Sequence, residues 1–341
     1  MSYASLRQEV LRKFPELKPQ RRFPLQALWF AFLLPAIVAL SALAARHAGP
    51  HALLATAEAL ALGLLYSSLG LLTHELLHGS ILKLSPATRV ISWFGFLVFG
   101  LSPEAWLTWH NRVHHFHTNE AGVDPDSFGL WRDFQKLPMS SFVLKRAPGS
   151  GHPLSWLYLP LNFNNQALTV TWYFLWKGDR RLYKTCNRPL AVAETLLMYA
   201  FWAAVAIALG GRAFVFVFLV PMLVANLVVS SYILVQHLFC PLTDENDPLE
   251  NTLGVTTLRF LDLIHFRFSH HVEHHIFPEM NHAQLARARE LLSREYKGRY
   301  RCMSHAKALK ILLSGPRVYR DETTLLDPRT GRTLSVARMG R

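Results

Sequence analysis

The sequence predicts an all-α integral membrane protein with four transmembrane helices and a cytosolic helical cap. The chain of 341 residues is 51 % hydrophobic and has a mean hydropathy of +0.16, yet its formal net charge is +13. An apolar chain with so much positive charge is typical of a membrane protein whose loops carry the charge. A nucleic-acid-binding protein is disfavoured, because the Lys and Arg residues flank apolar runs and form no continuous basic stripe.

Four apolar runs have the length that a membrane span requires, about 20 helical residues. They form two pairs, each joined by a short turn that contains glycine: 27–45 with 52–72, and 190–209 with 213–236. Two further apolar segments are predicted not to cross the membrane: 90–101 as a re-entrant or interfacial piece, and 154–176 at the interface. Residues 90–101 would rise only about 18 Å as a helix, which is short of a hydrocarbon core of roughly 30 Å. Residues 154–176 are interrupted by Asn and Pro.

The distribution of charge predicts the topology. If the N-terminus faces the cytoplasm, the two outer turns hold only Arg46 and Arg212, and the four spans hold no Lys or Arg. The rest of the 36 Lys and Arg residues would then lie on the inner side, as the positive-inside rule requires. Glu58 and Glu194 are the only carboxylates in the spans. A membrane metal transporter is therefore disfavoured, because such proteins carry ionisable residues deep in the membrane.

Histidine is concentrated in three short clusters, all on the predicted cytosolic side. The clusters are His74-Glu-Leu-Leu-His78, His110-Asn-Arg-Val-His114-His115 and His271-Val-Glu-His274-His275. Neutral imidazole is the commonest metal ligand in proteins. In a helix, residues four apart lie on one face, so His74 and His78 would point the same way. The same spacing joins His110 and His114, with His115 beside them.

A further histidine, His237, comes where the last predicted span ends. Alone it would be interpreted as an interfacial polar residue, but together with the clusters a ligand role is favoured. The candidate metal ligands are then His74, His78, His110, His114, His115, His237, His271, His274 and His275. So many imidazoles exceed the needs of one metal ion and suit two, and nitrogen ligands favour zinc, copper, iron or nickel. A dinuclear site beside a membrane suggests iron that activates dioxygen, so the predicted cap holds a His-rich di-metal site.

Several polar residues beside these ligands are candidates to orient the imidazoles through the second ring nitrogen. They are Glu75, His117, Asp124, Asp126 and Glu273. His265 and His270 also lie beside ligands, and either an orienting or a packing role fits them. For Asp124-Pro125-Asp126, a plain turn is an equal alternative.

The first cluster also fits the H-E-x-x-H pattern of zinc proteases, in which Glu75 would be the general base. Such a site needs only one more ligand. The surplus of histidines on the same predicted face therefore disfavours the protease.

The three clusters, in this order and with two pairs of predicted spans, resemble the histidine boxes of the membrane fatty acid desaturase family. The third box continues into Ile276-Phe277-Pro278, which is similar to the family's common HHLFP ending. The resemblance implies a four-helix membrane stem, a cytosolic cap and a centre of two Fe²⁺ ions. It also implies a further histidine near the end of the last span, which His237 matches. The predicted organisation is a basic cytosolic N-terminal segment, a desaturase-like membrane and catalytic domain, and a basic cytosolic C-terminal region: 1–26, 27–290 and 291–341.

The resemblance implies a desaturase that uses O₂ as co-substrate to introduce a double bond into an acyl chain. The substrate would be an acyl-CoA, an acyl carrier protein thioester or a glycerolipid, and no catalytic side chain is expected beyond the metal ligands. Related hydroxylases of lipids, alkanes or carotenoids have similar boxes, so hydroxylation is the alternative.

No heme-binding HPGG motif is present, so no fused heme or flavin donor is expected and electrons would come from a separate ferredoxin or cytochrome. The basic inner face suits such an acidic partner, although attraction to membrane lipid explains the same charge. Usage rich in Ala and Arg hints at a bacterial cytoplasmic membrane, with the active site and both termini on the cytoplasmic side. No nucleic-acid partner is expected.

Two smaller features complete the expectations. The N-terminal segment contains Leu6, Val10, Leu11 and Phe14 at helical spacing, which fits either a helix on the membrane surface or a frayed tail. The three cysteines, Cys186, Cys240 and Cys302, lack metal-ligand spacing and are predicted to be ordinary thiols.

Overall fold

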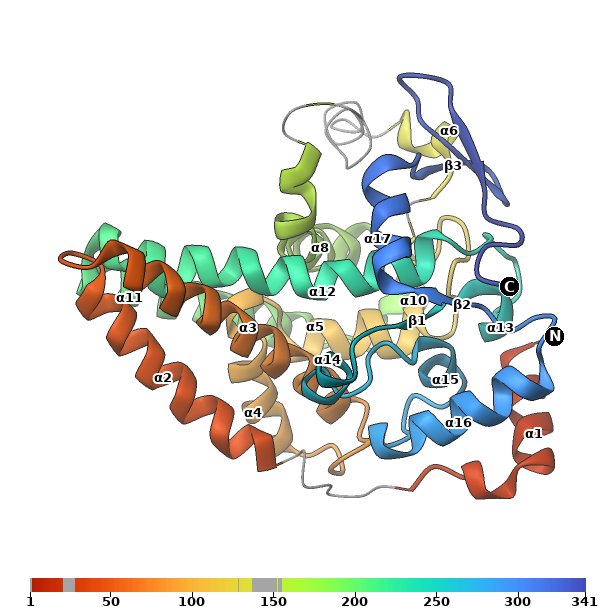
Figure 1. The fold of residues 1–341 in the computed structure, drawn as a ribbon, viewed down its shortest axis with the longest axis horizontal. Coiled ribbons are helices and arrows are strands. Elements are labelled where there is room, and N and C mark those ends of the chain that lie inside the picture. The colour runs from red at the N-terminus through yellow and green to blue at the C-terminus, as the bar shows by residue number, and fades with distance from the viewer. Residues whose placement is uncertain (1, 21–27, 128, 137–151, 153–154) are drawn as a thin grey trace. The chain divides into compact units, whose positions relative to one another are not determined.

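A computed structural model describes residues 2–20, 28–127, 129–136, 152 and 155–341 (Figure 1). The start of the first predicted span and residues 21–26 of the N-terminal segment lie outside the described residues. The chain divides into two compact units. The first unit comprises Met1–Gln20, Trp109–Leu159 and Ser231–Arg341, and the second comprises Arg21–Thr108 and Pro160–Ser230.

Among the described residues, three helical stretches are long and apolar enough to cross a membrane. They are α2 (Trp29–His47), α3 (Ala52–Leu77) and a 51-residue stretch, Arg188–Leu238. The last comprises α11 (Arg188–Phe214), the π-helical segment η7 (Val215–Leu219) and α12 (Val220–Leu238). Helices of this length and composition indicate a membrane protein.

The 51-residue stretch is broken at Gly210, where φ is 76° and ψ is 159°. Glycine adopts this conformation without a steric penalty, whereas other residues rarely do. The break falls in the turn predicted between residues 209 and 213. Arg212 Nη2 donates a hydrogen bond to the Gly49 carbonyl at 3.1 Å, so the break lies beside the turn that joins α2 to α3.

Polar residues within the second unit pair with one another. His47 Nδ1 lies 2.9 Å from the Glu58 carboxylate, so Glu58 makes a polar contact between α2 and α3. Glu194 of α11 accepts hydrogen bonds from the Ser102 hydroxyl and from the Glu104 amide. Both carboxylates that the sequence places in the spans are therefore partnered.

The two apolar segments predicted not to cross the membrane form only short helices. The first is α4 (Pro86–Gly95), followed by a 3₁₀ turn, Leu97–Phe99. The second region contains a 3₁₀ segment (Ser155–Leu161), α8 (Asn162–Thr169), a π-helical segment (Val170–Phe174), α9 (Leu175–Lys177) and α10 (Arg180–Tyr183). None of these helices has the length of a membrane span. Helix α4 lies very close to α3, because a Cβ on Gly95 would fall 1.7 Å from Thr73 Oγ1.

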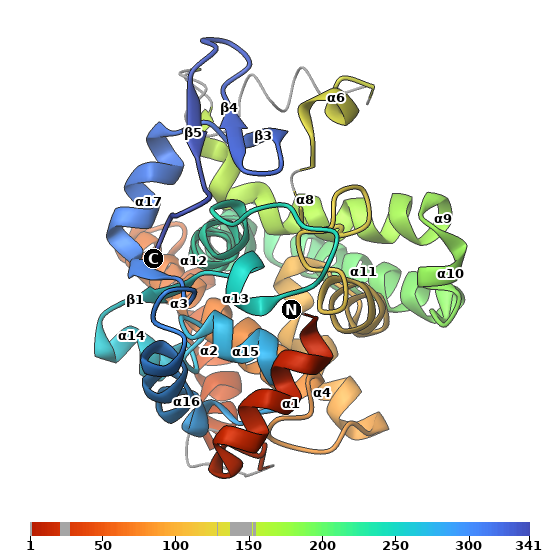
Figure 2. The same ribbon diagram turned by 90° about the vertical axis from the view of Figure 1, so that its right-hand side faces the viewer.

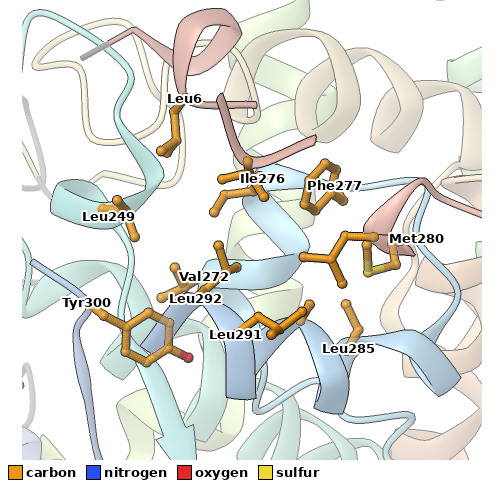
Figure 3. Close-up of a cluster of buried hydrophobic side chains, with 13 residues drawn as sticks. Leu6, Leu249, Val272, Ile276, Phe277, Met280, Leu285, Leu291, Leu292 and Tyr300 are labelled. Atoms are coloured by element: carbon orange, nitrogen blue, oxygen red, sulfur yellow. The ribbon is translucent and has the colours of Figure 1, made fainter. Parts of the chain in front are cut away.

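The first unit is built on a core of buried side chains (Figure 3). Its helices are α1 (Tyr3–Lys13), the 3₁₀ turn η1 (Pro15–Leu17), α6 (Trp131–Phe134), α13 (Pro248–Asn251), α14 (Arg259–Ile264), α15 (His271–Ile276), α16 (His282–Glu295) and α17 (His305–Ser314). Leu6 and Val10 of α1 are fully buried in this core together with Val272 and Ile276 of α15. The predicted N-terminal helix is confirmed, but protein covers its apolar face, so that face is not available to a membrane surface.

The first unit also contains two small sheets that the all-α prediction lacks. Strand β1 (Gly254–Thr256) pairs in parallel with β2 (Cys302–Ser304). Strands β3 (Val318–Asp321), β4 (Thr324–Leu326) and β5 (Thr333–Ser335) form an antiparallel sheet. Strands of three or four residues are too short to show a clear alternation of apolar and polar residues, which is why the sequence did not reveal them.

The antiparallel sheet reaches the end of α12. The hydroxyl of Tyr319, on β3, donates to the Leu238 carbonyl at 2.9 Å and lies 2.6 Å from the Cys240 carbonyl. These carbonyls belong to the terminus of α12, where no further helical turn can satisfy them. The three cysteines are free thiols, as predicted.

Candidate metal centre

The second histidine cluster lies on a π-helix, η4 (Leu107–His114), which continues from α5 (Pro103–Trp106). In a π-helix residue i bonds to residue i+5, and the His115 amide donates to the His110 carbonyl at 3.0 Å. This winding brings His115 above His110, with 3.2 Å between their Nε2 atoms. The prediction of an ordinary helix gave His110 and His114 as the aligned pair and placed His115 only beside them.

The third cluster forms α15 and brings its imidazoles against those of two other segments. His271 and His275, one turn apart, have their Nε2 atoms 3.1 Å apart. His271 Nε2 lies 2.7 Å from Nε2 of His237, in the last turn of α12. His274 Nε2 lies 3.2 Å from Nε2 of His115. The first unit therefore gathers two groups of ring nitrogens: His110, His115 and His274 in one, and His237, His271 and His275 in the other.

His114 is fully buried and lies beside the second group, with its ring centroid 4.6 Å from that of His237 and 5.0 Å from that of His275. Donor atoms of these three residues lie within 4.8 Å of one another. Nε2 of His114 makes no hydrogen bond with the part of the chain that the structure describes. A buried ring nitrogen of this kind is available to a metal ion.

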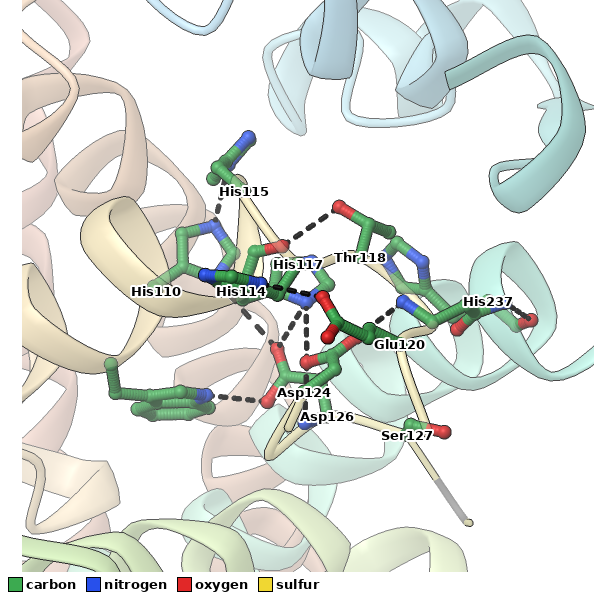
Figure 4. Close-up of polar contacts among 12 residues, drawn as sticks. His110, His114, His115, His117, Thr118, Glu120, Asp124, Asp126, Ser127 and His237 are labelled. Atoms are coloured by element: carbon green, nitrogen blue, oxygen red, sulfur yellow. Dashed lines mark hydrogen bonds and ion pairs between the residues drawn. The ribbon is translucent and has the colours of Figure 1, made fainter. Parts of the chain in front are cut away.

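Two carboxylates hold His114 from the other side (Figure 4). His114 Nδ1 lies 2.9 Å from Asp124 Oδ1 and 3.5 Å from Asp126 Oδ2. Burial alone would lower the pKa of His114, but the neighbouring carboxylates raise this pKa to about 9, so a metal ion that binds Nε2 would displace its proton. Asp126 also accepts from the Trp109 indole and lies 3.8 Å from His110 Nδ1. The Asp124-Pro125-Asp126 turn thus brings both of its carboxylates to the histidines.

A threonine that the sequence analysis missed orients a second ring. Thr118 Oγ1 donates to the His114 carbonyl at 2.8 Å and lies 3.3 Å from His275 Nδ1. Because the hydroxyl hydrogen is used on the carbonyl, the hydroxyl oxygen accepts from His275 Nδ1, which leaves the lone pair on Nε2. A threonine after a histidine cluster is too common to have signalled this role.

The first cluster lies at the end of α3, in the second unit. His74 and His78 have ring centroids 4.5 Å apart, and both rings contact that of Trp106, at 5.3 and 5.2 Å. The predicted pairing of these two residues on one helix face is therefore present. Glu75 lies 3.5 Å from His74 Nδ1 and accepts from the Ser80 hydroxyl.

Two candidates for orienting a ligand have other partners. His117 Nδ1 lies 2.6 Å from Glu120 Oε2, and its side chain is 31 % exposed. Glu273 is fully buried, accepts from the Tyr300 hydroxyl and lies 3.8 Å from Arg289 Nη2. Burial raises the pKa of Glu273 although Arg289 opposes this shift. His117 and Glu273 are close to the ligands in sequence but bond to other groups, because successive helical residues point in different directions.

The two further histidines beside the clusters also bond elsewhere. His265 Nδ1 lies 3.1 Å from the Tyr232 hydroxyl, and His270 Nδ1 lies 2.9 Å from the Ser269 hydroxyl. Burial lowers the pKa of His270 to about 2 and that of His265 to about 4. Both rings are therefore neutral near pH 7, as expected of packing residues.

The chemistry of the two nitrogen groups fits metal ions. One ring nitrogen offers either a hydrogen or a lone pair, not both. His115 Nε2 and His271 Nε2 each face two other Nε2 atoms at 2.7 to 3.2 Å. Hydrogen bonds satisfy these contacts only if the central nitrogen carries a hydrogen and both neighbours a lone pair, or the reverse. A shared cation satisfies three lone pairs at once, and two nitrogens bound about 2.1 Å from one metal at a right angle lie about 3.0 Å apart.

These helices and this buried cluster of imidazoles define a membrane protein with a histidine-rich metal-binding centre. The family model described as fatty acid desaturase matches residues 48–306, most of the chain. The chain therefore belongs to the fatty acid desaturase family, and the family resemblance of the histidine boxes is confirmed. A comparison with curated proteins found no significant match. Family membership makes the chain an oxidoreductase and leaves the zinc protease without support.

Proposed function

We propose that this protein is a membrane-bound di-iron desaturase that uses O₂ and electrons from a separate carrier to introduce a double bond into a fatty acyl chain. The carrying observation is the convergence of two groups of Nε2 atoms, drawn from three segments of the first unit, in a chain of this family. Two groups suit two metal ions.

The proposed ligands follow these groups. His110, His115 and His274 would hold one iron, whereas His114, His237, His271 and His275 would hold the other. We propose that His74 and His78 complete the set, because their spacing and paired rings match the first box of the family. Bound iron would supply activation of dioxygen for removal of hydrogen from an unactivated methylene group.

The chain itself orients the ligands and keeps the site dry. Asp124 and Thr118 occupy the Nδ1 atoms of His114 and His275, so the lone pairs of both rings stay on Nε2. His114 and His275 are almost completely buried, which excludes bulk water from the proposed centre. No acid–base side chain is required, because the removed hydrogen is bound to carbon.

We propose a topology of four crossings, with the break at Gly210 separating the last two. The contact of Arg212 with Gly49 supports it, since both turns would then lie on the same side. The positive-inside rule would put the histidines and both termini on the cytoplasmic side of a bacterial membrane. The acyl carrier would be CoA, an acyl carrier protein or a glycerolipid, and the donor a ferredoxin or cytochrome.

The test is the fatty acid profile of a bacterial host that expresses the chain together with a ferredoxin and its reductase. Gas chromatography–mass spectrometry should find a new unsaturated acid with the wild type and with His117→Ala, but not with His114→Ala. His117 is the matched control, because it lies three residues from His114 and bonds to Glu120 instead. A new hydroxy acid would assign the centre to hydroxylation. An unchanged profile from protein that contains iron would contradict the acyl substrate.

A further inference from the structure

The first unit exposes three large apolar side chains in the short helix α14 and at the residue before it. Leu258, Phe260 and Leu263 are 72 %, 66 % and 55 % exposed. Phe260 and Leu263 lie on one face of the helix at a spacing of three residues, and exposed Arg259 lies next to them. Single apolar residues on a surface need no explanation, but three large and strongly exposed ones within six residues, beside an exposed arginine, are typical of a binding surface.

Helix α14 is held firmly in spite of this exposure. The Asp262 side chain accepts from the Ser269 hydroxyl, and the Asp262 carbonyl accepts from the Arg267 amide at 2.8 Å. Phe266 and Arg267, directly after the helix, have φ values of 52° and 54°. Non-glycine residues rarely adopt this left-handed conformation, and surrounding contacts must maintain it. The apolar face is thus presented by a fixed corner of the chain.

The segment that follows α14 contacts the end of α12. His265, the residue after α14, bonds through Nδ1 to the Tyr232 hydroxyl at 3.1 Å. The ring of His305, at the start of α17, stacks on Tyr232 at 4.4 Å. Tyr232 lies six residues before the end of α12 at Leu238, which is about 9 Å along the helix axis. The residue that follows α14 therefore contacts the last two turns of a helix long and apolar enough to cross a membrane, and Figure 2 shows α14 following β1 in the same unit.

We propose that α14 is an interfacial anchor, whose apolar residues Leu258, Phe260 and Leu263 enter the boundary between headgroups and acyl chains of a phospholipid bilayer. The contact of His265 with Tyr232 supports this, because the last turns of α12 are where that span would leave the membrane. Arg259 suits this boundary, because an arginine can bury its apolar stem and keep its guanidinium among the headgroups. The anchor is independent of the reaction that the metal centre performs.

The test measures the surroundings of α14 in the full chain reconstituted into vesicles of phosphatidylcholine and phosphatidylglycerol. Phe260→Cys and Leu263→Cys are labelled with an environment-sensitive fluorophore in a background that carries Cys186→Ser and Cys302→Ser. Cys240 is fully buried and is retained. The matched control is Lys297→Cys, an exposed position of the same unit in the turn after α16.

The lipid quencher is a nitroxide near the headgroup end of the acyl chain. Its quenching should be about threefold or more stronger at residues 260 and 263 than at residue 297. The reason is that the apolar face of an interfacial helix is buried roughly 5–10 Å into the boundary between headgroups and acyl chains. Quenching by aqueous iodide should show the reverse order. Equal iodide quenching at all three positions would overturn the proposal. So would a blue-shifted emission without lipid quenching that fades when the protein is diluted in lipid, since this result would assign the face to a second copy of the chain.

Discussion

Nδ1 of His114 and Oδ1 of Asp124 lie 2.9 Å apart, and both side chains are completely buried. The aspartate also accepts the backbone amides of Asn119 and Asp126, so its carboxylate is fixed before any metal binds. A carboxylate in this position sets the tautomer of a ligand imidazole and raises the basicity of its other nitrogen.

Replacing Asp124 with Asn should therefore weaken metal binding, because the amide keeps the size of the side chain but loses its charge. We expect a loss of about 10-fold to 100-fold in iron affinity or activity, the range found for partners of ligand imidazoles. The measurement is iron content after equilibration with graded amounts of a chelator. Glu120→Gln is the control, since Glu120 bonds to His117. Equal loss in both variants would contradict the role given to Asp124.

His115 and His271 are the central members of their groups, because each Nε2 faces two other ring nitrogens. His115→Ala and His271→Ala should each leave protein with about half of the wild-type iron, since ligand number determines whether a site holds its metal. Iron per chain is measured by mass spectrometry of the purified protein. A wild-type iron content in either variant would show that the corresponding group does not hold a metal ion.

The close contact of α3 with α4 predicts the effect of adding one carbon. Gly95→Ala would place Cβ 1.7 Å from Thr73 Oγ1, so the two helices must separate. We expect a loss of about 1–3 kcal/mol in the free energy of unfolding, typical of overpacking. Gly49→Ala is the matched control, because no atom lies within 4 Å of the added Cβ. Thermal unfolding in detergent should show a lower midpoint for Gly95→Ala alone.

Tyr319→Phe removes the hydroxyl that reaches the end of α12. The buried Leu238 and Cys240 carbonyls then lose a donor, which costs about 1–3 kcal/mol for each unsatisfied group. We expect a lower unfolding midpoint for Tyr319→Phe than for Tyr173→Phe. The second variant is the control, because it removes the hydroxyl of a half-exposed tyrosine. Identical midpoints would show that these carbonyls find other donors.

The sequence predicted the long apolar helices and the histidine clusters, because both follow from local composition and spacing. The turn at Gly210 and the pairing of His74 with His78 follow from composition and from the period of a helix. The close approach of His110 and His115 could not be predicted in this way, since it depends on a π-helical winding that hydrophobic periodicity does not reveal. Glu273 accepts from Tyr300, a tertiary contact, and His117 bonds to Glu120 three residues later. The place of both residues beside ligands in the sequence does not reveal these partners.

The contact of Tyr319 with the end of α12 also bears on how chimeras of this enzyme should be made. The family match ends at residue 306, yet Tyr319 lies beyond it, and the carbonyl of Gly340 accepts from the amide of Cys302. An exchange of segments at the family boundary would separate α12, which carries His237, from the strand that satisfies its last carbonyls. Swap points are therefore better placed in the second unit, such as the turn at Gly210.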